Sequence, residues 1–364
     1  MSEVIEKLNR VRNFIAENKL DGVLLTSNPN FCWISGGKSA FVDKASESAV
    51  AKVLVTMDKV YVICNSSEMY RIPEEELTDG TYELVAYKWH ESEYEAIKSL
   101  IEGKKIASDS GAHGTLNMSG KIQQLRYVMT EEEEAHMDEI GLQSAQILED
   151  CVRNIVAGET EYEIAGRVAG AMMAKGYQIP VLLVAADDRI MKYRHPLPKD
   201  TKVTKRALVA VCVQKYGLTI SMTRMVSFEP LPEEIQKKYE ALLKIDAAYI
   251  LNTKAGVQTK DILKKAYDAY AAEGYEADFH LHHQGGALGY LTRDYCTNFG
   301  TEDVVLDHQG FSWNPTIAGV KLEDTFVVNG NKQKIVSETG TWVYRDVEID
   351  GQIIRRPDIL IEEL

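Results

Sequence analysis

The sequence predicts an α/β protein built from two domains, at residues 1–127 and 128–364. Three observations lead to this prediction. A chain of 364 residues is long for one domain and has room for two hydrophobic cores. Strand-like and helix-like patterns alternate up to about residue 125, which is typical of an α/β domain. Beyond that point, two long amphipathic helical patterns precede a strand-rich stretch that begins after residue 178.

The first domain should open with a helix, because apolar residues recur at helical spacing over residues 4–18. Two runs rich in Val, Ile and Leu, at 22–26 and 52–64, predict buried strands, and the second run should turn once on itself. A helical pattern over 93–103 and a strand pattern over 104–109 complete the alternation.

The second domain should begin with two capped helices. The first covers residues 130–155, where Thr130 is a candidate N-cap and acidic residues follow it in the first turn. The second covers 159–177, with Thr160 and Glu163 at the spacing of a capping box. Two more helices are expected at 239–254 and 259–275.

Composition excludes several classes of function. Hydrophobic residues make up 45% of the chain and charged residues 26%, as in ordinary globular proteins. A formal net charge of -14 argues against a nucleic-acid partner held through phosphates. The five cysteines form no CxxC pair, which favours reduced thiols and a cytoplasmic location. No apolar run is long enough to span a bilayer, so no membrane partner is expected.

The segment LVAVCVQKYGLTISMTR, from Leu208 to Arg224, carries the most specific signal. It resembles the metal-binding hairpin of the creatinase, prolidase and aminopeptidase P family, peptidase family M24. The resemblance implies a C-terminal pita-bread fold and a smaller creatinase-like N-terminal α/β domain. In this family the hairpin carries two metal-binding aspartates, and the matching positions here are Ala210 and Ser221. Neither side chain can bind a divalent ion as a carboxylate does.

Two further motifs match the family but lack its ligands. FHLHHQGGALGY (279–290) resembles the HxxGHxxG strand-turn, with Gly286 where the metal-binding histidine would stand. GFSWNP (310–315) resembles a strand whose carboxylate ligand is replaced here by Asn314.

Only one position that the resemblance assigns to a metal ligand is retained. GVKLEDTFVV (319–328) resembles the GVRIEDTVLV strand, and Glu323 occupies its ligand position. A catalytic metal commonly needs about three protein ligands. The chain therefore resembles a divergent member, closest in kind to the metal-free creatinase, and we expect neither a bound metal nor another cofactor.

Three residues are candidates for catalysis. RHPLPKD (194–200) places His195 where creatinase has its proton-transfer histidine, and His282 matches a histidine that contacts substrate in the family. With Glu323 they could activate water by acid–base chemistry, because a carboxylate raises the basicity of a neighbouring imidazole. Thr223 stands where creatinase has a second glutamate, so creatine itself is a doubtful substrate.

A small substrate carrying a carboxylate is expected. Arg224, Arg293 and Arg194 are candidates to bind that carboxylate through paired N–H donors, while Thr223 and Phe41 could complete the substrate site.

The resemblance also implies a homodimer in which each N-terminal domain closes the partner's site. NFCWISGGKSAF (30–41) lies in the matching region, where Trp33, Lys38 and Phe41 could line the pocket. Trp33 could equally be a core residue.

Several alternatives stay open at this point. If the segment around His280 is a strand, His280 and His282 share one face and could form a metal pair, while His283 points to the other face and is structural. The function favoured is a metal-independent hydrolase or lyase acting at a C–N bond. The alternatives are a non-catalytic binding module on a peptidase scaffold and an Xaa-Pro aminopeptidase or dipeptidase.

Overall fold

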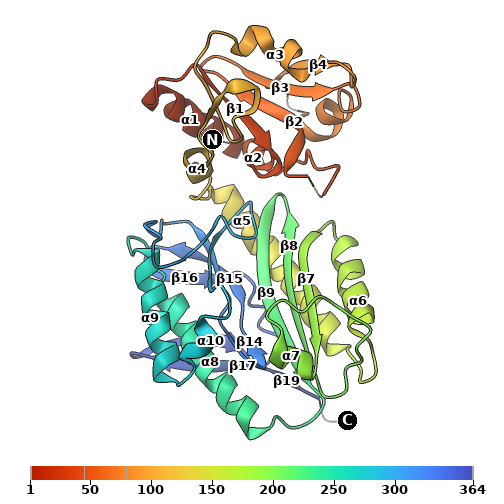
Figure 1. The fold of residues 1–364 in the computed structure, drawn as a ribbon, viewed down its shortest axis with the longest axis vertical. Helices are drawn as coiled ribbons and strands as arrows, with labels where there is room; N and C mark the ends of the chain where they lie inside the picture. Colours follow the sequence, from red (N-terminus) through yellow and green to blue (C-terminus); the bar gives the residue numbers. More distant parts are fainter. Residues whose placement is uncertain (1, 45, 79, 363–364) are drawn as a thin grey trace. The chain divides into compact units, whose positions relative to one another are not determined.

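The computed structural model describes residues 2–44, 46–78 and 80–362. The chain divides into two compact units, Met1–Tyr127 and Val128–Leu364 (Figure 1). No helix within the described ranges is both long and apolar enough to cross a membrane. The cytoplasmic location and the homodimer expected from the sequence stay predictions.

The N-terminal unit is a six-stranded mixed sheet flanked by helices, with strand order β4-β3-β2-β1-β5-β6. Its strands are β1 (Gly22–Ser27), β2 (Ser48–Val55), β3 (Val60–Asn65), β4 (Glu83–Tyr87), β5 (Ile106–Ser108) and β6 (Leu116–Asn117). Its helices are α1 (Glu3–Glu17), α2 (Asn28–Ile34), α3 (Glu93–Ile101) and α4 (Ser119–Gln124), with a π turn at Ile72–Glu76 and a 3-10 turn at Ala112–Gly114.

The region that the sequence assigned to a substrate pocket is partly core. Residues 28–34 form α2, which the sequence reading did not predict, and Trp33 is fully buried within it. Trp33 is therefore a core residue, which decides between its two expected roles. Phe41 is half-buried and Lys38 is exposed in the loop that follows, and their role at the substrate site stays a prediction.

The C-terminal unit contains two curved halves, each a sheet with helices against it (Figure 1). The first sheet has the order β19-β9-β8-β7, from β7 (Gln178–Ala186), β8 (Arg206–Lys215), β9 (Leu218–Ser227) and β19 (Leu360–Ile361). The second has the order β11-β10-β12-β15-β16, from β10 (Gly285–Leu288), β11 (Tyr295–Cys296), β12 (Gly310–Trp313), β15 (Asp324–Asn329) and β16 (Lys332–Ile335). Two ribbons pair β13 (Thr316–Ile317) with β14 (Val320–Lys321) and β17 (Tyr344–Ile349) with β18 (Gln352–Pro357).

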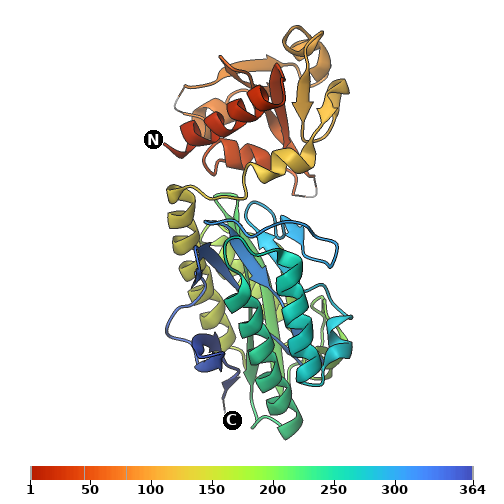
Figure 2. The same cartoon turned by 90° about the vertical axis from the view of Figure 1, so that its left-hand side faces the viewer.

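Six helices within the described part of this unit accompany these sheets. They are α5 (Glu131–Arg153), α6 (Glu161–Met173), α7 (Asp188–Lys192), α8 (Glu233–Asn252), α9 (Thr259–Ala272) and α10 (Glu276–Phe279). Helices α5 and α6 belong to the first half, where α5 packs on β9 and α6 on β7. Helices α8 and α9 run side by side in the second half (Figure 2). The two halves meet where β9 passes β15, and there the N–H of Thr223 donates to the carbonyl of Glu323 at 2.9 Å.

Local sequence signals account for the ends of several helices. The side chain of Thr130 caps α5 and that of Thr160 caps α6, each in a complete capping box with the glutamate three residues later, so both predicted caps are confirmed. Helix α8 begins at Glu233, six residues before the predicted start. The prediction missed its first turns because they are polar except for buried Ile235 and show little apolar periodicity.

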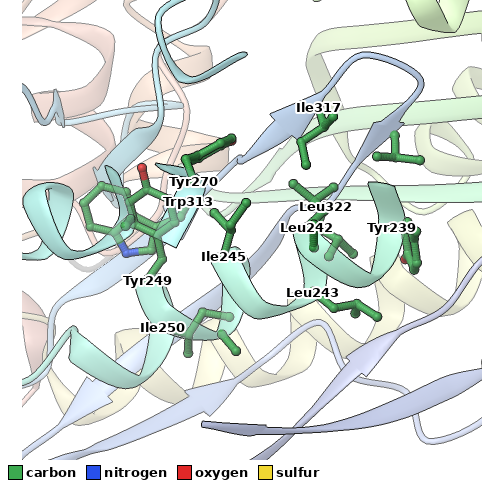
Figure 3. Packing of buried hydrophobic residues seen from close by; sticks show 14 of the residues in the cluster. Tyr239, Leu242, Leu243, Ile245, Tyr249, Ile250, Tyr270, Trp313, Ile317 and Leu322 are labelled. Atoms are coloured by element: carbon green, nitrogen blue, oxygen red, sulfur yellow. The ribbon is translucent and has the colours of Figure 1, made fainter. Parts of the chain in front are cut away.

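The apolar core of the C-terminal unit lies under α8. Figure 3 shows Leu242, Ile245 and Tyr249 of this helix pointing toward Trp313 and Leu322 of the second half. Full burial of each large apolar side chain stabilises the fold by about 1.5–3 kcal/mol. This packing holds the second sheet at a fixed place beside the seam with β9.

Candidate functional site

A cavity of about 230 Å³ opens in the C-terminal unit, beside the seam between the two halves. Strands β7 and β8 supply its apolar wall. The polar wall comes from the loop that carries His195, from Arg293 and Cys296 at or near β11, from Lys321 at the end of β14 and from Glu323 just before β15. Two residues that the sequence predicted for the site, His195 and Glu323, therefore line the same cavity although they are far apart in the chain.

Cations occupy the region to which the family resemblance assigns metal ions. Arg293 Nη2 donates to Glu323 Oε1 at 2.8 Å, and Lys321 Nζ donates to Glu323 Oε2 at 2.8 Å. Thr223 Oγ1 donates to the same Oε2 at 3.2 Å. Arg293 Nη1 also donates to Ser221 Oγ at 3.1 Å. Ser221, which stands where the family has a metal-binding aspartate, therefore accepts a hydrogen bond from a guanidinium group.

The remaining ligand positions cannot supply a metal site either. Ala210 has no donor atom, and the Asn314 amide is a neutral group. A Cβ atom at Gly286 would lie 2.3 Å from the Tyr295 carbonyl oxygen, so no side chain fits there. One carboxylate already paired with two cations does not suit a divalent ion. The residues present do not fit the family's metals.

Glu323 acts here as a counter-ion, which corrects one expectation from the sequence. Burial alone would raise the pKa of its carboxyl, but Lys321 and Arg293 outweigh burial and lower that pKa to about 2. Its oxygens accept from Arg293, Lys321 and Thr223, and no hydrogen bond to a histidine is present among the described residues. Glu323 therefore does not orient His195 or His282.

Three histidines cluster at the edge of this cavity. His195 Nε2 lies 2.9 Å from His282 Nε2, and the His283 ring centroid lies 4.4 Å from that of His282 and 5.9 Å from that of His195. Burial and the Lys321 ammonium lower the pKa of His282 to about 2, burial and Arg293 lower that of His283 to about 4, and burial lowers that of His195. All three imidazoles are therefore neutral near pH 7.

The histidine cluster differs from what the sequence suggested. Residues 280–284 form a turn after α10, and the strand begins only at Gly285, so the strand alternation assumed for His280 and His282 does not exist. His280 packs instead on Tyr267 and Phe279. His283, expected to be structural, joins the cluster because a turn does not send neighbouring side chains to opposite faces.

Arg224 is excluded as a substrate-binding residue. Its side chain is 1% exposed and forms ion pairs with Glu149 at 3.1 Å and Asp324 at 3.0 Å. Because neighbouring residues of a strand face opposite ways, Thr223 contacts Glu323 while Arg224 points to the other side of β9. The choice between a substrate-binding and a structural Arg224 was left open by the sequence, which does not tell which face of the hairpin is covered by α5.

The other predicted substrate residues are placed as follows. Arg194 forms an ion pair with Asp278 at 2.9 Å and does not line the cavity, so its expected substrate contact is not seen. Thr223 is buried and its hydroxyl is used by Glu323. Arg293 lies on the cavity wall, as a substrate contact requires, and that role stays a prediction.

Lys321 is the functional candidate that sequence reasoning missed. Its Nζ has one partner among the described residues, Glu323, and its side chain is 6% exposed on the cavity wall. A lysine two residues before the retained glutamate would alternate onto the same face of a strand, and this signal was present in GVKLED.

Comparison with known proteins places both units. Residues 135–330 match metallopeptidase family M24, and residues 7–126 match the creatinase/prolidase N-terminal domain. The "Xaa-Pro dipeptidase" of Pyrococcus horikoshii is 23% identical over 354 residues, which is 92% of this chain and 97% of that protein. That of Pyrococcus furiosus is 22% identical over 357 residues, which is 92% of this chain and 98% of that protein.

Solved structures share the fold. The structure titled dipeptidase PepE from Mycobacterium ulcerans superposes with a TM-score of 0.79 at 18% identity, over 100% of this chain and 98% of that one. The prolidase structure from Pyrococcus horikoshii gives 0.76 at 18% identity, over 92% and 98%. The predicted pita-bread domain and creatinase-like N-terminal domain are thereby confirmed.

Proposed function

This chain belongs to metallopeptidase family M24, and from that membership we propose that it hydrolyses a C–N bond in a small carboxylate-bearing molecule, without metal ions at the family's ligand positions. The observation that carries the proposal is the charge of the cavity wall. Two cations, Arg293 and Lys321, face one carboxylate, Glu323, which leaves an excess of one positive charge among the lining residues.

The two cations keep donors for a substrate. Arg293 Nε is buried without a partner among the described residues, and Lys321 Nζ uses only one of its three protons on Glu323. A substrate carboxylate could accept from Lys321 in a charge-assisted hydrogen bond, whereas Arg293 would have to shift its buried Nε to donate as well. The Asn314 side-chain oxygen is also buried without a partner among the described residues.

The size of the cavity limits the substrate. Sites for drug-sized ligands have volumes of roughly 300–1,000 Å³. At about 230 Å³ this cavity suits a molecule no larger than a dipeptide or an N-substituted amino acid.

His195 and His282 would carry out the proton transfers. A neutral imidazole of His195 takes a proton from water as the water oxygen bonds to the substrate carbonyl or amidino carbon. The same proton then passes to the leaving nitrogen as the C–N bond breaks, so no proton is gained or lost. His282, 2.9 Å away, would fix the orientation of the His195 ring.

A second candidate, cleavage of Xaa-Pro dipeptides, is favoured by the comparisons. Two relatives that align over more than nine-tenths of their length carry the name Xaa-Pro dipeptidase. Against it stand Ala210, Ser221 and Gly286, at positions that the family uses for metal ligands. A third candidate, a binding module without turnover, predicts binding of the same small molecules without release of an amine.

One panel of assays separates the three. Xaa-Pro dipeptides, other dipeptides, and N-carbamoyl and N-amidino amino acids are incubated with the full chain, with chelator or with added Mn²⁺ or Co²⁺, and amine release is measured. Turnover that is unchanged by chelator supports the first candidate. Xaa-Pro cleavage that requires metal supports the second, and calorimetric binding without turnover supports the third.

The variant His195→Gln sharpens the test. Loss of a general acid–base group should lower kcat by about 10²-fold or more while the fold is retained. Arg345→Gln, an exposed arginine paired with Asp358, is the control and should leave turnover unchanged. Undiminished turnover in His195→Gln would contradict the assigned mechanism.

A further inference from the structure

The three clustered imidazoles have no carboxylate partner among the described residues, and their ligand atoms all lie within 4.8 Å of one another. We propose that His195, His282 and His283 form a three-nitrogen site for one divalent transition-metal ion, such as Zn²⁺, Co²⁺ or Ni²⁺. None of these three residues stands at a position that the family resemblance assigns to a metal ligand.

The distances suit a metal. Zinc–nitrogen bonds measure about 2.0–2.1 Å, so two nitrogens on one metal at angles between 90° and 109° lie about 2.9–3.4 Å apart. The Nε2 atoms of His195 and His282 are 2.9 Å apart. The ring centroid of His283 lies 4.4 Å from that of His282, and its ligand atom lies within 4.8 Å of those of the other two histidines, so a side-chain adjustment would complete the set. His283 Nδ1 also lies 3.8 Å from Cys296 Sγ, so the rotation would replace this contact with the metal.

The donor type selects the metal. Neutral imidazole is the form that binds metals, and burial keeps all three imidazoles neutral near pH 7. Imidazole favours zinc, copper, nickel and iron over magnesium and calcium, which require oxygen ligands. Three histidines leave a fourth coordination position open, as in catalytic zinc sites, and His195 and His283 both line the cavity.

The Lys321 ammonium group lies close enough to the three histidines to affect metal binding. Lys321 contributes to the lowered pKa of all three histidines, so its positive charge also opposes a bound cation. Neutralising Lys321 should therefore tighten metal binding. The inference does not rest on the proposed function, because binding is measured directly. Metal binding and proton transfer would use the same imidazoles, so the two would exclude each other. The site would also revise the expectation, drawn from the sequence, that the protein retains no divalent metal.

The test is a titration of the untagged, chelator-treated full chain with Co²⁺, in which the visible absorption of the bound Co²⁺ is measured. Displacement of the bound Co²⁺ by Zn²⁺ then gives the zinc affinity. One Co²⁺ per chain is expected. His283→Gln should weaken binding by roughly ten-fold or more. His280→Gln is the matched control, since His280 lies three residues away on the same turn but packs on Tyr267, and it should leave the affinity unchanged. Lys321→Met should tighten binding.

The absence of stoichiometric binding would overturn the proposal, and so would an equal loss in His280→Gln and His283→Gln, or weaker binding in Lys321→Met. If His283→Gln fails to fold, an NMR measurement on the wild-type chain still tests which histidines bind the metal. Bound Co²⁺ should broaden the imidazole NMR signals of three of the eight histidines, and a signal from His280 among them would contradict the site.

Discussion

Two charge networks lie back to back across β9 and β15, and they balance their charges in different ways. Behind the strands, Arg224 and Arg356 face Glu149, Asp246 and Asp324, all with side chains at most 2% exposed. In front, Arg293 and Lys321 face Glu323 on the cavity wall. Strand alternation produces the division, because Thr223 and Glu323 face forward while Arg224 and Asp324 face back.

The difference shows what enclosure does to charge. The closed network has one carboxylate more than it has cations. Burial raises the pKa of Asp246 to about 6 and also raises that of Glu149. Both shifts favour uptake of a proton, which would bring the network to neutrality. The open network has one cation more than it has carboxylates. Water and solutes reach it, so the surplus charge can be met by a ligand. We therefore interpret the closed network as structural and the open one as a binding site.

The largest expected effect is loss of the closed network. Arg224→Gln should lower the free energy of unfolding by about 3–5 kcal/mol, because it leaves Glu149 buried without its arginine. Arg293→Gln should cost less, since Glu323 keeps Lys321 and Thr223. Urea denaturation of the C-terminal unit measures both. Equal losses would mean that the two networks are not different in kind.

The next effect concerns ligand binding by the open network. Arg293→Gln should weaken binding of a small carboxylate ligand from the panel by about 10- to 100-fold, as for loss of a hydrogen bond to a charged group. Isothermal calorimetry measures the change, with Arg345→Gln as the control. Unaltered affinity in Arg293→Gln would place the ligand elsewhere.

The networks should also respond to pH in opposite directions. The Glu323 pKa is lowered, so its contribution to stability is full above about pH 4.5 and is lost as pH falls toward 2. The Asp246 pKa is raised, so its contribution is full below about pH 4 and is lost as pH rises through about 6. Each slope is at most about 1.4 kcal/mol per pH unit.

Denaturation midpoints between pH 3 and 7 test this opposition. The stability of the wild-type chain relative to Glu323→Gln should increase with pH, below about 4.5, while its stability relative to Asp246→Asn should decrease between about 4 and 6. Slopes of the same sign would refute the contrast.

The smallest effects come from single neutral donors. Thr223 donates to Glu323 at 3.2 Å in the open network, and Ser337 donates to Asp324 at 2.7 Å in the closed one. Thr223→Val and Ser337→Ala should each cost about 0.5–1.5 kcal/mol of unfolding free energy. Ser337→Ala should cost more, because no water can replace its hydroxyl. Thermal unfolding of the two variants compares them directly, and the reverse order would count against the enclosure of the rear network.

Sequence patterns were most reliable for elements defined by their own residues. Two kinds of element depend only on residues within a turn or two of one another: the capping boxes at Thr130 and Thr160, and the apolar stripe of α1. Their spacing can therefore be recognised in the sequence. The strand considered as an alternative at 280–284 is a turn, and alternating apolar residues and histidines are compatible with either structure.

The sequence by itself determined the family, the pita-bread scaffold and the absence of suitable side chains at Ala210, Ser221 and Asn314, because these depend on which residues stand at which positions. Only the tertiary structure decided what fills the resulting space. Lys321 and Arg293 reach Glu323 from separate segments, and His283 joins His195 across nearly ninety residues of chain. These contacts between distant residues follow from how the two sheets of the C-terminal unit pack together, and no local sequence pattern encodes that packing.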